Sequence, residues 1–106
     1  MKVNLLENAI LIVLEKTDNI NSLKSEIMSD KHSKKNIVID LNNVIINDFL
    51  SIFKFLVENQ KNKNKSLVFL TKKNNNNIED LNVIPTIQEA IDFIFLEEIE
   101  RDLNLL

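Results

Sequence analysis

Few side chains in this sequence have the chemistry of a catalytic or metal-binding site. His32 is the only histidine, and it stands among Lys31, Lys34 and Lys35. A catalytic histidine needs an orienting partner, and a zinc site usually needs three or four ligands. We therefore interpret His32 as a solvated residue that caps the end of a helix. The chain has no cysteine, which excludes disulfides, thiolate metal sites and cysteine nucleophiles.

The remaining candidates for chemistry are acidic residues near the C-terminal end. These side chains could bind a divalent cation, but we interpret them as the solvated face of a final helix; they are Glu97, Glu98, Glu100 and Asp102. The absence of glycine excludes a Walker phosphate loop and a Gly-x-Ser-x-Gly nucleophile elbow. A two-zinc hydrolase would need several histidines. We therefore expect a protein that is not an enzyme and that uses neither a cofactor nor a metal.

Asp48 and Ser51 stand at the predicted start of the second helix. An aspartate in this place accepts hydrogen bonds from backbone amides and suits the helix dipole, so the simpler interpretation of Asp48 is an N-cap. The alternative is that Asp48 marks a binding surface. Phosphorylation of Ser51 would place a dianion near the positive end of the helix, a stabilising location, whereas the simpler interpretation is an ordinary polar residue.

The charge of the chain is unevenly distributed. Residues 1–78 hold 12 lysines and 8 acids, a net +4, whereas residues 79–106 hold 8 acids and one arginine, a net −7. This pattern argues against a nucleic-acid footprint over the whole domain. No apolar stretch approaches the length of a membrane-spanning helix, and residues 1–6 are too short and polar for a signal peptide. We expect no nucleic-acid or membrane partner, and a cytoplasmic location.

Hydrophobic patterning predicts strands that alternate with helices. Apolar runs at 3–6 and 9–14 predict a hairpin, and the β-branched run before Asp40 is typical of a buried strand. The predicted order is strands at 3–6 and 9–14, a helix at 18–31, a strand at 36–41, a helix at 49–59, a strand at 66–71, a short helical turn at 78–81, a strand at 83–84 and a helix at 87–103. This order implies one α/β domain, residues 1–106, with a mostly parallel sheet.

The last helix has the clearest start signal in the chain. Thr86 and Glu89 have the spacing of a capping box. The helix carries two apolar stripes, of which we expect one to face the sheet, namely Ile87, Ala90, Ile91, Ile94 and Phe95. The second consists of Phe93, Leu96, Ile99 and Leu103. A surface helix of a monomer needs only one apolar stripe, so we interpret the second as a partner or self-association surface. Burial under loops or under Leu105 and Leu106 is the alternative.

The order of these motifs resembles the sulfate transporter and anti-sigma factor antagonist (STAS) domain over about residues 9–104. The segment IVIDLNNV at 37–44 is similar to the family's strand ending in Asp-Leu, and Asp48 stands where the family places the Asp of its Asp-Ser-Ser helix start. The third likeness is IPT at 84–86 followed by Glu89 and Ala90. The resemblance implies a five-stranded mixed, mostly parallel sheet with an N-terminal antiparallel hairpin, three main helices and a short one. It also implies binding to a protein partner such as a kinase-like anti-sigma factor.

The chain departs from the family at the site of the phosphorylation switch. Phe49 and Leu50 stand where the family usually has hydroxyl residues, and Ser51 comes one position late. The resemblance therefore implies a regulatory interaction module without the usual serine switch. The predicted partner-binding residues are Asn47, Asp48, Leu50, Ser51, Lys54, Phe93, Leu96, Ile99 and Leu103.

Two other functions remain open: a homo-oligomeric structural protein, such as a homodimer, and a small-molecule-binding subunit of an enzyme. A pocket with convergent polar groups would favour the small-molecule function. An exposed apolar patch without such a pocket would favour the interaction module.

Overall fold

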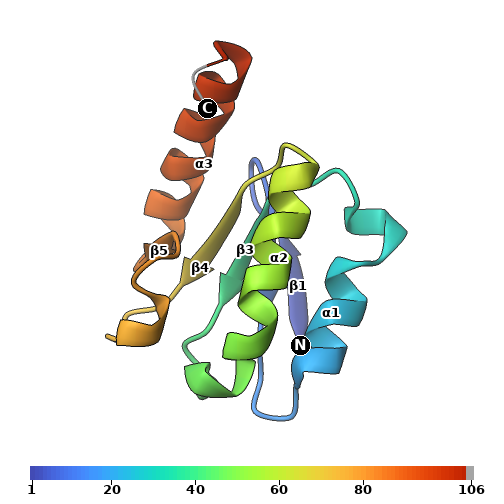
Figure 1. Cartoon of the computed structure of the whole chain (residues 1–106), viewed down its shortest axis with the longest axis vertical. Coiled ribbons are helices and arrows are strands. Elements are labelled where there is room, and N and C mark those ends of the chain that lie inside the picture. Colours follow the sequence, from blue (N-terminus) through green and yellow to red (C-terminus); the bar gives the residue numbers. More distant parts are fainter. Residues whose placement is uncertain (105–106) are drawn as a thin grey trace.

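A computed structural model describes residues 1–104 and contains one five-stranded sheet in the order β1-β2-β3-β4-β5 (Figure 1). β1 and β2 form an antiparallel hairpin, and every other neighbouring pair is parallel. The strands are β1 (Lys2–Leu5), β2 (Ile10–Val13), β3 (Ile37–Asp40), β4 (Leu67–Leu70) and β5 (Val83–Ile84). The predicted mixed, mostly parallel α/β sheet with an N-terminal hairpin is confirmed.

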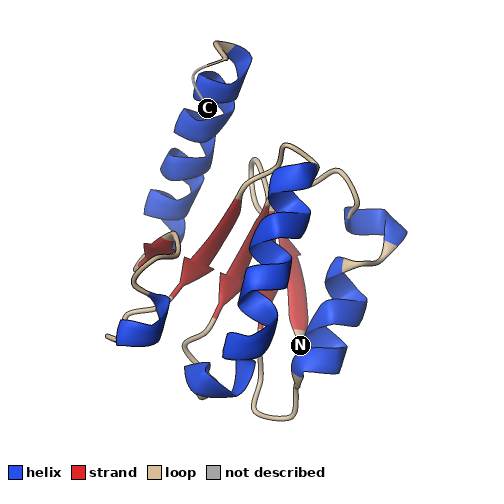
Figure 2. Cartoon of the chain, in the orientation of Figure 1, coloured by secondary structure: helices blue, strands red, loops and turns tan. Residues whose placement is uncertain are grey.

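Three α-helices and three short 3₁₀ turns connect or follow these strands within residues 1–104 (Figure 2). They are α1 (Ile20–Ile27), α2 (Leu50–Asn62), α3 (Ile87–Asp102) and the turns Asp30–His32, Ile46–Phe49 and Asn76–Ile78. α1 is shorter than the predicted helix at 18–31, because Ser29 has an extended backbone that separates α1 from the turn behind it. α2 runs three residues beyond the predicted end at 59, and the predicted turn at 78–81 lies at Asn76–Ile78.

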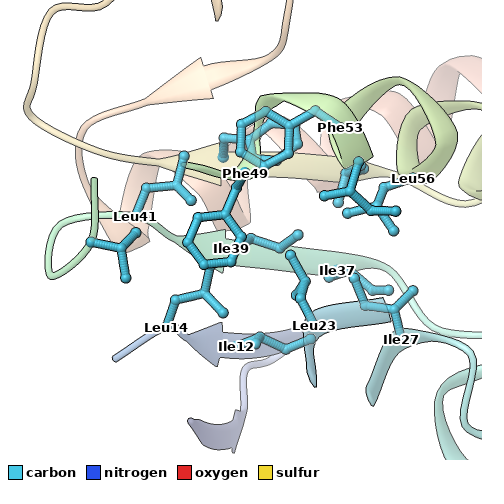
Figure 3. Close-up of a cluster of buried hydrophobic side chains, with 14 of the residues drawn as sticks. Ile12, Leu14, Leu23, Ile27, Ile37, Ile39, Leu41, Phe49, Phe53 and Leu56 are labelled. Atoms are coloured by element: carbon cyan, nitrogen blue, oxygen red, sulfur yellow. The ribbon is translucent and has the colours of Figure 1, made fainter. Parts of the chain in front are cut away.

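α1 and α2 cover one face of the sheet and enclose the larger hydrophobic core (Figure 3). Parallel strands that are neighbours in sequence order need right-handed crossovers, and these place the connecting helices on the same face. The ring centroids of Phe53 on α2 and Phe69 on β4 lie 4.5 Å apart, with planes tilted by 48°. Such a tilted aromatic pair adds to the stability that burial of the two rings provides.

α3 follows the last strand and packs on the opposite face. Ala90 and Ile94 are buried against Val38 of β3 and Val68 of β4. The helix begins where Thr86 Oγ1 accepts a hydrogen bond from the Glu89 backbone N–H. The Thr86 half of the predicted capping box is therefore formed.

The predicted inner stripe of α3 is wrong at two positions, because Ile87 and Phe95 are exposed. Ala90 and Ile94 lie 40° apart around the helix axis at 100° per residue, whereas Phe95 lies about 100° farther round. Phe93, which we predicted on the second apolar stripe, is half-buried and packs against the hydrophobic cluster between α3 and the sheet.

Candidate interaction surfaces

The start of α2 differs from the sequence prediction. The N-cap of α2 is Phe49 and not Asp48, and no side chain caps the helix. Burial of Ile46 and Phe49 winds the chain into a 3₁₀ turn before the helix begins, and Asp48 lies within that turn. The N-cap interpretation of Asp48 is therefore wrong, and its side chain is exposed.

The predicted partner-binding residues around Asp48 have different exposures. Ser51 and Lys54 are exposed on the first turns of α2, whereas Leu50 is half-buried against the larger core. Asn47 is exposed, and its Oδ1 accepts hydrogen bonds from the side-chain amides of Asn75 at 3.0 Å and Asn77 at 3.3 Å. These bonds fix the loop after β4 beside the start of α2.

The other predicted surface lies on α3. Leu96, Ile99 and Leu103 expose 55%, 54% and 62% of their area, and Phe95 is exposed beside them. The four residues fall within an arc of about 100° around the helix, on the side away from Ala90 and Ile94. We call Phe95, Leu96, Ile99 and Leu103 the outer face of α3.

The structure does not bring the two surfaces together. α2 begins at the end of the molecule where the parallel strands end, while the C-terminal half of α3 extends beyond the opposite end (Figure 1). The Arg101 guanidinium confirms this direction, because it donates a 3.1 Å hydrogen bond to the hydroxyl of Ser66, just before β4. The start of α2 and the outer face of α3 are therefore separate surfaces.

A buried polar cluster attaches α3 to the sheet. The Asn36 side-chain amide donates to the backbone oxygen of Asn8 at 2.9 Å and to Glu98 Oε1 on α3 at 3.2 Å. Its Oδ1 accepts from the Ser66 backbone N–H at 2.8 Å. In turn, the Asn8 side chain donates to the Ile91 backbone oxygen at 2.9 Å. Asn36 thus joins the hairpin turn, the start of β4 and α3.

The sequence reasoning missed Asn36 and Gln60 as buried polar residues. Gln60 follows Ile52, Phe53 and Leu56 at helical spacing, so the buried stripe of α2 could have placed it toward the sheet. Asn36 opens a continuous apolar strand, and nothing in that pattern indicates three hydrogen-bond partners distant in the sequence.

His32 is not the solvated helix cap that the sequence suggested. Its side chain is only 7% exposed, and Nε2 lies 2.6 Å from Glu26 Oε2 on α1. The 3₁₀ turn Asp30–His32 brings the ring back toward the helix, and Lys31 lies 3.8 Å from the same carboxylate oxygen. The pair fastens this turn to α1.

Two hollows lie at opposite ends of the strands. One, of about 470 Å³, lies between α2, β4 and α3, where Gln60, Ser66 and Arg101 contribute to its lining. The other is at the carboxyl ends of the strands, and its lining includes Asp18 and Asp48. Among residues 1–104 no three His, Asp or Glu side chains are grouped closely enough to hold a metal ion.

Asp18 has a perturbed carboxyl group at the start of α1. Burial raises its pKa, but three donors outweigh burial and hold the pKa below the ordinary value of 3.8. These donors are the Glu15 backbone N–H at 2.8 Å, the Met1 ammonium at 3.0 Å and the Ser22 hydroxyl at 3.5 Å.

We expect Asp18→Asn to lower the free energy of unfolding at pH 7 by about 1.5–3 kcal/mol, the range for hydrogen bonds to charged groups. Because the pKa of Asp18 is lower in the folded chain, its carboxylate stabilises the fold above about pH 4, and this stabilisation is lost as the pH falls through the folded-state pKa. Urea unfolding at pH 7 and pH 3 tests this, with the exposed Asp80→Asn as the control. An equal difference between wild type and Asp18→Asn at both pH values would contradict it.

Comparison of the sequence with models of protein families and with curated proteins found no match. Within residues 1–104, none of the helices combines the length and the apolar character that crossing a membrane requires.

Proposed function

We propose that this chain is a non-enzymatic protein-interaction module that resembles the STAS domain. The observation that carries the proposal is the outer face of α3, where four large apolar side chains are exposed together. Contiguous apolar patches on soluble proteins commonly mark interaction sites. The order of strands and helices is compatible with a STAS domain, and it supports the family resemblance without being specific to it.

The charge of α3 favours a cationic partner over a second copy. Residues Ile87–Asp102 contain six acids and one arginine, and at 100° per residue Asp92, Glu100 and Asp102 lie within or beside the outer face. An isologous homodimer would place two such helices against each other, and the repulsion of like charges would oppose it. A partner with an apolar groove or helix bordered by lysine or arginine complements both features of α3.

The start of α2 is a second proposed binding surface, separate from the outer face of α3. STAS domains contact kinase-like anti-sigma factors around this turn, and we extend that role to Asn47, Asp48, Ser51 and Lys54. Leu50 contributes less, because it is half-buried against the core. Ser51 is exposed in the first turn of α2, so its hydroxyl is accessible to a kinase. A phosphate on it would lie near the positive end of the helix. We propose that the module works without the family's usual serine switch, because Phe49 and Leu50 stand where the family has hydroxyl residues.

The test uses affinity enrichment of the tagged chain from its own cells, read by mass spectrometry. We expect the double variant Leu96→Asp/Ile99→Asp to reduce enrichment of a specific partner at least tenfold, because each carboxylate interrupts the apolar patch. We expect Lys54→Glu to weaken the binding of a partner that also contacts the start of α2. The matched control is Met28→Asp, a change at an exposed apolar side chain on another surface.

Two results would oppose the proposal. One is that the α3 double variant enriches the partner as well as wild type does. For this comparison the double variant and Met28→Asp must unfold at the same urea concentration as wild type. The other is light scattering that shows a stable dimer at micromolar concentration, lost in the same double variant, because the outer face would then serve self-association.

A further inference from the structure

The cavity between α2, β4 and α3 lies along an unpaired part of the sheet edge. β3 bonds to Ser66 and Leu70, since Ile37 and Leu41 donate to their backbone oxygens. Alternate residues of a strand turn their backbone groups to opposite neighbours, so the backbone groups of Leu67 face the β5 side.

β5 is too short to satisfy Leu67. Phe69 and Thr71 donate to Asn82 and Ile84 on the β5 side, and the register pairs Phe69 with Val83. Two residues earlier, the same register would place Leu81 opposite Leu67, but Leu81 is held by a turn in which its N–H donates to Ile78. No backbone hydrogen bond within residues 1–104 reaches the N–H of Leu67 from that side. Leu67 lines the cavity.

A second unsatisfied group belongs to Gln60, another residue of the cavity lining. Gln60 is 2% exposed, and its side-chain amide donates to the backbone oxygens of Lys35 at 3.0 Å and Ser66 at 3.1 Å. These two bonds use the amide hydrogens and identify Oε1 as the free acceptor, which has no partner among the described residues. Buried polar groups without partners are rare in folded proteins. The sheet edge beside the cavity therefore has an unpaired backbone donor at Leu67, and Gln60 of the cavity lining carries a buried acceptor without a partner.

The charged side chains of the cavity lining have a positive excess. Lys61, Lys65 and Arg101 line it together with the acids Asp80 and Glu97. Leu67, Phe69 and Leu81 supply apolar walls. A peptide group would satisfy Leu67 as a neighbouring strand does, a carboxylate would attract the cations, and an apolar side chain would suit the walls.

We propose that this cavity binds the C-terminal end of another polypeptide, whose last two residues lie extended beside Leu67 with the terminal carboxylate near Arg101. β5 already occupies the edge beside Phe69, so a short chain end fits along Leu67 better than a strand that continues past it. None of these residues belongs to the outer face of α3, so the inference does not depend on the function proposed above.

The experiment is an NMR titration of the ¹⁵N-labelled full chain with pools of N-acetyl tetrapeptides, whose last two positions vary among Ala, Val, Leu, Ile and Phe. One pool ends in a free carboxylate and the matched pool ends in an amide. We expect the free-acid pool to shift the amide of Leu67, slow its hydrogen exchange and bind at least tenfold more tightly than the amidated pool. We also expect Arg101→Gln to weaken the binding about tenfold.

Arg101 also bonds to Ser66, so a second variant protects the test from a loss of folding. Lys61→Gln changes an exposed side chain and should weaken binding about threefold, while Lys31→Gln, outside the cavity, should not change it. Equal binding of the two pools, or no shift at Leu67, overturns the proposal. Tenfold tighter binding of free, unacetylated dipeptides also overturns it, because the occupant would then be a small molecule and not a polypeptide tail.

Discussion

Replacement of Phe53 by alanine is expected to lower the free energy of unfolding by about 4 kcal/mol, which is typical when a large buried aromatic side chain is removed. Phe53 is buried on α2 (Figure 3), and its ring packs against that of Phe69 on β4. The variant leaves a cavity between the helix and the sheet and also removes the aromatic pair. Urea denaturation followed by circular dichroism measures the change.

Phe55 provides the matched control because it stands two residues away on the same helix. Its ring is exposed, and the Lys24 ammonium lies over it, 5.0 Å from the ring centroid. Exposed cation–π pairs contribute about 0.5–1 kcal/mol, so Phe55→Ala should cost about 1 kcal/mol or less. Similar losses for the two variants would show that α2 does not pack on the sheet through the face that carries Phe53.

We expect Asn36→Ala to lower the free energy of unfolding by about 3 kcal/mol. The variant removes three hydrogen bonds, each worth about 1 kcal/mol net, and leaves the Ser66 N–H without its acceptor. Because Asn36 connects the strands to Glu98, α3 should loosen before the rest of the chain unfolds. Urea denaturation measures the loss of stability of the variant. Its backbone amides should exchange hydrogen faster around Ile94 on α3 than around Leu56 on α2.

Two further variants test the cause of this loss. Asn36→Asp keeps an acceptor for Ser66 but loses both donors and places a carboxylate beside that of Glu98, so it should be at least as destabilising as alanine. Asn43→Ala removes an exposed asparagine and should change stability by less than about 0.5 kcal/mol. If Asn36→Ala costs no more than Asn43→Ala, the cluster does not hold α3.

Local patterns in the sequence determined the secondary structure and most of the sheet. The β-branched run at 37–39 forms a strand because its side chains pack on both faces, and Thr86 begins α3 because its hydroxyl satisfies a free amide of the first turn. The exposure of Leu96, Ile99 and Leu103 also followed from helical spacing. The binding roles given to these residues and to the start of α2 remain predictions.

Only the tertiary structure decided the rest, because those features depend on groups that are distant along the chain. The burial of Ile46 and Phe49 moved the start of α2 past Asp48, and contact with Glu26 buried His32. The partners of Asn36 stand 28, 30 and 62 residues away, and no local spacing encodes such distances. The unpaired edge at Leu67 likewise arises because β5 begins only opposite Phe69, a result of how the two strands align across the sheet.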